Sequence, residues 1–406
     1  MKVSKSVKCA KFRKVANNFR PEPECFCLGV SHLLTGKVGN RGVFDRVFPP
    51  LLRTCALLSY FLVVVLTILS IESANAQDVA LRYGTGVPAA VRIINDRGLR
   101  YLANSQMEDG GWAGAGSGPG VTGICVMALM ASGEDPDFGP YATTIRKALR
   151  NIISNQDART GYIGGTWGGH GSMYQHGFAL LALSEAYGAV SERLLWEGSN
   201  IPPERRRTLS EALELAVRSS LTAQRKNPWG AWRYSPESQD ADTTVAGTVL
   251  MGVLGARNAG IEIPNEAVDK AVNFFQTHTM QDGSVTYQMT SSHGGGLTRT
   301  AIGTLIYAIA KRKDTPEYKA ASEFIKRRID HRGTGHLFYN LYYMAQALFQ
   351  SDFEAWKAWN QRTIEWLQKT QAEDGSFSSS HGRAYGTGMA ILALALNYRL
   401  LPIYER

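Results

Sequence analysis

The chain has 406 residues, of which 44% are hydrophobic, 10% aromatic and 19% charged, and this composition excludes both a disordered protein and a small disulfide-stapled fold. Its formal charge of +9 comes mostly from the N-terminal part: residues 1–76 hold 11 basic and 4 acidic residues, whereas residues 77–406 hold 33 and 31. Because the body of the chain is nearly neutral, it lacks the basic surface that nucleic-acid-binding proteins use.

Residues 1–76 have the features of a basic leader with a signal peptide. A basic stretch ends at Arg53, an uncharged apolar run covers residues 55–71, and small residues precede Gln77. This order is typical of a secretory signal peptide, with cleavage expected after Ala76. We therefore expect an exported protein, periplasmic or extracellular. The alternative is a retained membrane anchor, since the apolar run approaches the shortest length that spans a bilayer.

One phrase recurs along the body of the chain: an amphipathic helix, a glutamine, a glycine-containing turn with an aromatic residue, and a more apolar helix. The most complete copy contains Gln106, Gly110 and Trp112. The other copies contain Gln156 with Gly161, Gln224 with Gly230 and Trp232, Thr279 with Gly283, and Gln371 with Gly375 and Phe377. The fifth copy, near residues 329–335, has lost the glutamine.

The copies predict six pairs of helices. The first helices carry charges around one face and are expected to form an outer layer over residues 87–106, 138–156, 204–224, 264–280, 315–330 and 353–371. Their partners are rich in Ala, Gly, Leu and Met and are expected to be buried all round, over residues 121–132, 174–189, 242–257, 298–311, 337–350 and 384–399.

Short connections between these helices predict antiparallel hairpins that close into a ring. We therefore predict an all-α protein, an α6/α6 toroid, with residues 77–406 as its single domain. No alternating polar and apolar run predicts a sheet. An open solenoid is the competing arrangement, and closure is favoured because neither terminal pair has the polar outer face of a cap.

At these residues the chain resembles the terpenoid cyclase and protein prenyltransferase superfamily of α/α-toroids. Residues 97–112 match its repeat throughout, and the resemblance covers about residues 87–406. It is most similar to short, exported squalene-cyclase-like proteins with prenyltransferase and squalene oxidase repeats. The resemblance implies a toroid and a structural role for the repeat residues Gln106, Gly110, Trp112, Gln224, Gly230, Trp232, Gln371 and Gly375.

The resemblance also implies a candidate acid. Cyclases of the squalene-hopene type protonate an alkene with the middle aspartate of Asp-x-Asp-Asp-Thr, and residues 240–244 of this chain are Asp-Ala-Asp-Thr-Thr. Asp242 is then the candidate catalytic acid and Asp240 its neighbour, although Thr243 replaces the third acid. The simpler interpretation, which we favour, makes Asp242 the N-cap of the third inner helix. Length also counts against a full cyclase, because such enzymes resemble two fused toroid domains.

Protein prenyltransferases of this superfamily hold zinc through an Asp, a Cys and a His. Cys125 is the only cysteine after residue 76, and it lacks the family's Asp two residues earlier. Its apolar neighbours predict a buried thiol on an inner helix. No pair of histidines has the spacing of two metal ligands on one helix. We therefore predict neither a metal site nor a cofactor.

Most histidines are expected in the outer-to-inner connections, which a closed ring places on one rim, together with the positive ends of the inner helices. The histidines concerned are His170, His176, His293, His331, His336 and His381. Arginines and tyrosines join them at Arg233, Arg299, Arg383, Tyr174, Tyr234, Tyr287 and Tyr385.

We predict a ligand site on this rim, above a central cavity, for an anionic-headed or isoprenoid-like apolar ligand. Its expected contacts are His176, His293, His381, Arg299, Arg383, Tyr174 and Tyr385. The alternative for any single histidine beside a glycine is that it only orders its loop.

Two other function classes stay open. A sugar-active α6/α6 enzyme would need paired carboxylates, but Asp109, Asp282 and Asp374 each precede a glycine in an ordinary turn dipeptide. A protein-interaction module would use a face of the toroid to hold a protein partner. An apolar-lined cavity would favour the isoprenoid ligand, and a filled cavity would favour the interaction module.

Overall fold

The computed structural model describes residues 86–114, 116–164, 172–288, 295–330, 336–398 and 400. The leader, residues 1–76, lies outside these ranges, so its signal peptide and cleavage site stay predictions. Across the described ranges the chain forms thirteen α-helices and two short 3₁₀ helices, and its one β-contact is an isolated bridge between Thr279 and Val285. None of the helices in these ranges has the length and apolar character of a membrane span.

Six outer helices alternate with six inner helices, as the repeat predicts. The outer helices are α3 (Ala89–Ser105), α5 (Ala142–Ser154), α8 (Leu209–Lys226), α10 (Asn265–Thr277), α12 (Pro316–Lys326) and α14 (Phe353–Thr370). The inner helices are α4 (Pro119–Ala131), α6 (Ser172–Ala186), α9 (Thr243–Asn258), α11 (Leu297–Ile309), α13 (Leu337–Ser351) and α15 (Arg383–Leu394), which continues into η2 (Ala395–Asn397). Between α6 and α8 the chain adds α7 (Glu192–Leu195) and η1 (Pro203–Arg205), which were not predicted.

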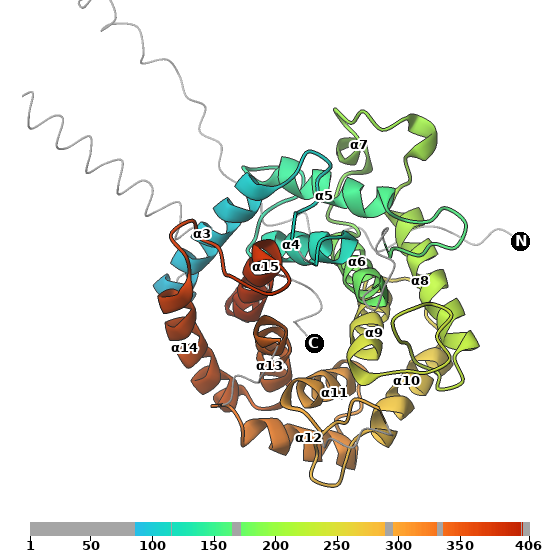
Figure 1. The fold of residues 1–406 in the computed structure, drawn as a ribbon, viewed down its shortest axis with the longest axis vertical. Helices are drawn as coiled ribbons and strands as arrows, with labels where there is room; N and C mark the ends of the chain where they lie inside the picture. Colours follow the sequence, from blue (N-terminus) through green and yellow to red (C-terminus); the bar gives the residue numbers. More distant parts are fainter. Residues whose placement is uncertain are drawn as a thin grey trace, which may run out of the picture. The chain divides into compact units, whose positions relative to one another are not determined.

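Burial separates the two layers. Every residue of α4 is buried, and α9 is buried from Val245 to Ala256. By contrast, α5 buries Ile145, Leu149 and Ile152 on one face and leaves other positions to the solvent. Figure 1 shows the resulting ring within a ring, with the inner helices surrounded by the outer ones.

The ring is closed. Each inner helix contacts the next, in the order α4, α6, α9, α11, α13, α15 and back to α4, and the last outer helix, α14, contacts the first, α3. Figure 1 shows the red C-terminal pair beside the blue N-terminal helix. The prediction of an α6/α6 toroid is therefore confirmed, and an open solenoid is excluded.

The repeat glutamines join neighbouring outer helices. The Nε2 amide of Gln106 donates to the carbonyl of Gly110 in its own turn and to the carbonyl of Thr144 on the next outer helix, both at 2.9 Å. Three other joints have the same pair of bonds: Gln156 to Gly161 and Ala212, Gln224 to Gly230 and Ala267, and Gln371 to Gly375 and Ile94. One amide thus satisfies carbonyls of two consecutive repeats.

The repeat glycines and tryptophans complete these joints. Gly375 has a φ of 87°, and a Cβ atom there would lie 2.3 Å from the carbonyl oxygen of Arg97 on α3. The indole N–H groups of Trp112 and Trp232 donate to carbonyls in the last two turns of their outer helices, at 2.8 Å to Leu102 and 2.9 Å to Ser220. Only a glycine lets the turn approach the next helix this closely.

Replacing Gly375 with alanine should destabilise the toroid more than replacing Gly188, which has a similar φ of 82° but open space around it. We expect Gly188→Ala to cost about 1–2 kcal/mol from backbone strain. Gly375→Ala should cost a further ~1–3 kcal/mol, because the α3 carbonyl must move. Denaturant unfolding of both variants measures the difference, and equal losses would contradict the close-approach explanation.

Candidate functional site

The first turns of the inner helices meet on one rim. The Gly120 N–H at the start of α4 donates to Gln175 Oε1 of α6 at 2.7 Å, and Asn340 of α13 donates to Thr298 of α11 at 2.9 Å. Contacts between first turns show that these neighbouring inner helices run parallel. Their positive ends therefore face the same rim, as the ring closure predicts.

Asp242 lies at this rim as the N-cap of α9. Its Oδ1 atom accepts hydrogen bonds from the backbone N–H groups of Thr244 and Val245, at 3.0 and 2.9 Å, and from the Thr244 hydroxyl at 2.6 Å. The residue has no exposed surface. The N-cap interpretation of Asp242 therefore agrees with the structure.

The second carboxylate oxygen of Asp242 is not used for capping. Oδ2 is buried and accepts no hydrogen bond from the described residues. The Arg233 Nε atom lies 3.8 Å away, and it too is buried without a hydrogen-bond partner in that part of the chain. Burial raises the pKa of the Asp242 carboxyl above its usual value, against the lowering effects of its hydrogen bonds and of Arg233.

Arg233 connects Asp242 to the surface. Its guanidinium group lies 5.0 Å from the ring centre of Tyr234 and 5.9 Å from that of Tyr287, and it forms an ion pair with the half-exposed Asp240. The two tyrosine hydroxyls are 2.5 Å apart. Asp240, the other candidate catalytic residue, and Asp242 therefore lie on either side of the same guanidinium group.

Two predicted ligand residues lie beside this carboxyl. The Tyr174 hydroxyl is 2.5 Å from the Thr244 hydroxyl, which in turn donates to Asp242. Burial and the Asp242 charge raise the pKa of Tyr174 well above its usual value. Burial lowers the pKa of Arg299, while the nearby Tyr287 and Asp242 oppose that shift. The structure thus connects Tyr174 to Asp242 through Thr244, while Arg299 donates to the carbonyl of Val285 at 3.3 Å and lies within the electrostatic range of Asp242.

Aromatic side chains meet across the middle of the ring. The helices α6 and α13 are on opposite sides, because two inner helices separate them in either direction. Yet Tyr174 and Phe178 of α6 lie with ring centres 6.3 Å from Tyr339 of α13, and Phe178 is 6.2 Å from Tyr342. Thr248 of α9 also reaches the hydroxyls of Tyr339 and Tyr343, at 2.9 and 3.2 Å.

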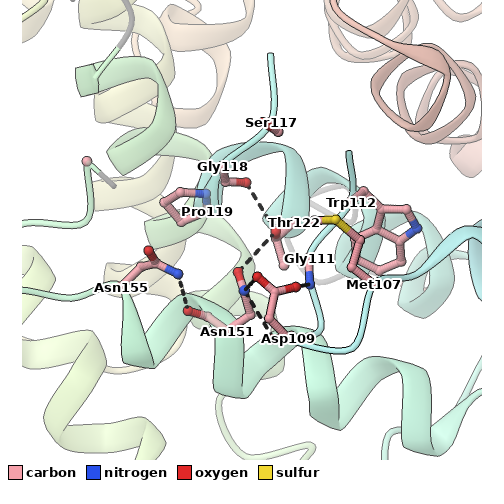
Figure 2. A pocket seen from close by; sticks show the side chains of 11 residues that line it. Met107, Asp109, Gly111, Trp112, Ser117, Gly118, Pro119, Thr122, Asn151 and Asn155 are labelled. Atoms are coloured by element: carbon pink, nitrogen blue, oxygen red, sulfur yellow. Dashed lines mark hydrogen bonds between the residues drawn. The ribbon is translucent and has the colours of Figure 1, made fainter. Parts of the chain in front are cut away.

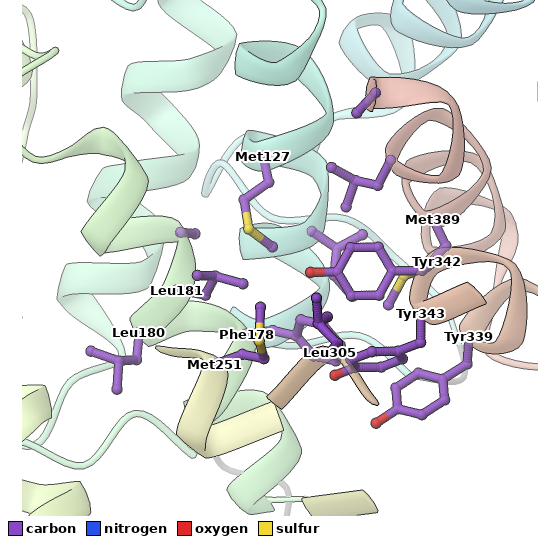
Figure 3. Packing of buried hydrophobic residues seen from close by; sticks show 14 of the residues in the cluster. Met127, Phe178, Leu180, Leu181, Met251, Leu305, Tyr339, Tyr342, Tyr343 and Met389 are labelled. Carbon is purple, nitrogen blue, oxygen red and sulfur yellow. The ribbon is translucent and has the colours of Figure 1, made fainter. Parts of the chain in front are cut away.

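We call Tyr174, Phe178, Tyr339, Tyr342 and Tyr343 the aromatic layer, and Figure 3 shows four of them with the apolar side chains around them. These residues belong to the first two or three turns below the rim. The central cavity predicted from the sequence is therefore crossed by side chains at this level.

His176 lies inside the framework. Its Nδ1 atom accepts the N–H of Ile163 at 3.1 Å, and its Nε2 atom is 2.9 Å from the Ser220 hydroxyl. The side chain is completely buried and packs on Tyr162. The position of His176 therefore does not support the predicted ligand contact, because the histidine joins the connection at Ile163 to the outer helix α8 instead. His293, another predicted contact, lies outside the described residues.

The remaining predicted contacts form a separate group. His381 packs edge-on against Tyr385, with ring centres 5.0 Å apart, and its Nε2 atom is 3.1 Å from His336 Nδ1. Arg383 is more than half exposed and bonds to Asp374 at 2.8 Å. Arg383 and Arg299 are thus each bonded to their own connection, since Arg299 Nε donates to the carbonyl of Val285 at 3.3 Å.

The acidic turn residues do not form catalytic pairs within the described residues. Asp109, Asp282 and Asp374 each accept the backbone N–H two residues further on, at 2.9 Å. A pocket of about 170 Å³ beside Trp112 holds one of them, as Figure 2 shows. There Asn151 donates to Asp109 at 3.2 Å, so this pocket offers one carboxylate, already engaged. The sugar-active alternative gains no support.

Cys125 is completely buried, and burial raises the pKa of its thiol. Its sulfur faces the backbone carbonyl of Ala384 at 3.8 Å. No group of three or more potential metal ligands occurs among the described residues. The thiol therefore belongs to the core.

Sequence reasoning missed the contribution of α13. Tyr339, Tyr342 and Tyr343 are hydroxyl-bearing residues on a helix that is otherwise almost entirely apolar and buried. Such a run on a predicted inner helix is the signal that could have identified it, since buried hydroxyls require partners. The hydroxyls of Tyr339 and Tyr343 meet Thr248 of α9, a helix that is not a neighbour of α13 in the ring, and that arrangement depends on closure.

No family model and no curated protein matches the sequence. Among solved structures, the chain is similar to a variant of type II terpene cyclase MstE from Scytonema in complex with geranylgeranyl dihydroxybenzoate, with a TM-score of 0.51 and 17% identity over 77% of this chain and 98% of that one. The same cyclase without a ligand gives a TM-score of 0.50 and 16% identity over 77% and 99%. This similarity supports a terpene-cyclase-like fold.

Acid should destabilise the protein through His176. Burial lowers its pKa from the usual 6.5 to about 4, so the folded state stays neutral while the unfolded chain takes up a proton. The stability that neutral His176 contributes is fully present above about pH 6.5. It falls by up to about 3 kcal/mol as the pH drops to 4. Unfolding free energies of the parent and His176→Gln over this range test the effect, and parallel curves would contradict it.

Proposed function

We propose that the chain is a cyclase-like enzyme in which Asp242 protonates a double bond of an isoprenoid substrate. The supporting observation is the asymmetry of this buried carboxyl: Oδ1 is fixed by three hydrogen bonds, and Oδ2 has none from the described residues. A proton on Oδ2 would therefore be available to a substrate double bond that lies beside this oxygen. Burial favours the protonated form, which is the form a general acid needs.

The tyrosines beside Asp242 suit the cation that protonation creates. Tyr174, Tyr234 and Tyr287 place aromatic rings around the carboxyl and Arg233. The face of such a ring attracts a positive charge, most strongly where water is excluded. The surroundings of Asp242 therefore agree with carbocation chemistry, and no metal ion is required for the proton transfer.

The size of the toroid is compatible with this function. This chain matches nearly the full length of MstE, which is described as a type II terpene cyclase and binds geranylgeranyl dihydroxybenzoate. A second toroid domain is therefore not needed for the fold of such an enzyme. The aromatic layer adds a condition, because the reacting end of the substrate must stay near the rim unless Tyr339 moves.

Incubation in deuterium oxide with linear C20 to C30 polyprenes and with geranylgeranyl dihydroxybenzoate tests this proposal. The Asp242 carboxyl delivers one deuteron to an alkene carbon, the cation closes a ring, and a proton is lost from a neighbouring carbon. The cyclic product should carry one deuterium, detected by mass spectrometry. Asp242→Asn should reduce turnover by about 100- to 10,000-fold, the contribution of a general acid, and keep its fold because Asn caps helices well.

Asp352→Asn is the matched control, since Asp352 caps the outer helix α14 through the N–H of Ala355 at 2.9 Å and lies in an inner-to-outer connection. It should keep the parental turnover. A product without deuterium, or equal rates for Asp242→Asn and the parent, would rule out acid catalysis by Asp242.

A second candidate is a rim receptor that holds an anionic-headed isoprenoid without converting it, and the aromatic layer is equally compatible with the protein-interaction module. Side chains that cross the ring leave the rim as the accessible part of the Asp242 surroundings. Arg299 and Tyr174 would then contact the head group.

Export of this receptor or enzyme remains part of the proposal, and N-terminal sequencing of the native protein decides whether the chain starts at Gln77.

Arg299→Gln should weaken binding of geranylgeranyl dihydroxybenzoate in either case. The carboxylate head loses one charged hydrogen bond, at a cost of about 1.5–3 kcal/mol. Arg383→Gln should leave the affinity nearly unchanged, because Arg383 is paired with Asp374 away from Asp242. Titration calorimetry measures both, with circular dichroism to check helicity. Equal affinities for the parent and Arg299→Gln would exclude Arg299 from the site.

A further inference from the structure

Two histidines from different connections face each other on the rim. His336 is the residue just before α13, and His381 lies two residues before α15. His336 Nδ1 and His381 Nε2 are 3.1 Å apart, and the rings lie 5.2 Å apart at an angle of 23°. Neither residue takes part in the arrangement around Asp242.

The separation of the two nitrogens matches that of two ligands on one metal ion. Imidazole nitrogens bind zinc at 2.0–2.1 Å, so two of them on a tetrahedral ion are about 3.3 Å apart, and about 2.9 Å in a square-planar arrangement. The observed 3.1 Å lies between these values. Small rotations of the rings would therefore direct both lone pairs to a common point.

The positions of the two side chains also suit an accessible ion. His336 is exposed and His381 is partly exposed, so water can complete the coordination sphere. The backbone around His381 is fixed: its carbonyl accepts the N–H of Gly116 at 3.1 Å, and its N–H donates to Ser379 at 3.2 Å. One ligand is thus held on a rigid turn before any ion arrives.

We infer that His336 and His381 form a two-histidine site for a divalent transition metal ion, of the class of Cu²⁺, Ni²⁺ and Zn²⁺. Imidazole ligands suit these ions and not Mg²⁺ or Ca²⁺, which prefer oxygen. The bound ion links the connection before α13 to the connection before α15. For both nitrogens to bind the ion, the ring that donates the hydrogen bond in the metal-free protein must carry its hydrogen on its other nitrogen instead.

Titration calorimetry of the metal-free protein with Cu²⁺ and Zn²⁺, and with Mg²⁺ as a control, tests the site. We expect one site for Cu²⁺, weaker binding of Zn²⁺ and none of Mg²⁺, following the usual order of affinities. Each of His336→Ala and His381→Ala should weaken Cu²⁺ binding at least about tenfold, and the double variant should remove it.

His336→Asn separates metal binding from a simple hydrogen bond between the rings. Asparagine can still bond to His381 but is a poor ligand for copper. It should therefore keep the parental melting temperature without metal and lose the increase that Cu²⁺ gives the parent.

Electron paramagnetic resonance of the Cu²⁺ complex gives an independent test, with two imidazole nitrogens expected in the parent and one in each single variant. A parental Cu²⁺ affinity in the double variant would overturn the inference, and so would a parental spectrum with no imidazole nitrogen. If Cu²⁺ still raises the melting temperature of His336→Asn as much as that of the parent, His336 is not a metal ligand and the contact between the two rings is only a hydrogen bond. None of these outcomes depends on the reaction proposed for Asp242.

Discussion

The ring depends on glutamine side-chain amides that join consecutive outer helices at four of its six joints. The carbonyls that accept these bonds lie in the turn after one outer helix and in the first two turns of the next outer helix. The glutamine at this point donates to its own turn and to the next outer helix at once, as Gln106 does with Gly110 and Thr144. Where the next outer helix also ends in such a glutamine, the same contact joins it to the pair that follows. Repeated around the molecule, this contact brings α14 back to α3.

The surroundings of Asp242 are a consequence of that closure. Parallel inner helices bring their first turns together, so the cap of α9 is covered by side chains of α6 and of the neighbouring connections. In a cap at the surface, the second carboxylate oxygen would lie in water. Here one oxygen is needed for the helix and the other is enclosed, and burial rather than a second carboxylate raises the pKa. This gives a physical route to an acid in a motif in which Thr243 replaces the third aspartate.

The outer and inner layers were predictable because each repeat carries its own signals: a charged face, a glutamine, a glycine with positive φ, and an apolar partner. The cap at Asp242 was equally local. The contacts of the rim residues could not be predicted in this way, because His176 and Arg383 both stand beside glycines in the sequence. In the structure His176 is buried between Ile163 and Ser220, whereas Arg383 bonds to the partly exposed Asp374. The aromatic layer was missed for a different reason. An inner helix is buried on all sides, so its periodicity does not show that Tyr339 points across the ring.

Closure also has a consequence for the order in which the protein is assembled. The amide of Gln371 and the carbonyl of Ile94 are 277 residues apart in the chain, so the final joint must wait until all six pairs have been made. Contacts at such separation are slow to form, and the entropy lost in closing the loop is repaid only at that last step. Until then the incomplete ring exposes the apolar flanks of its first and last pairs, which are the surfaces that α3 and α14 bury in the finished molecule. The newly made chain therefore exposes an apolar surface at each end of the incomplete ring, and the two surfaces pack against each other when the ring closes.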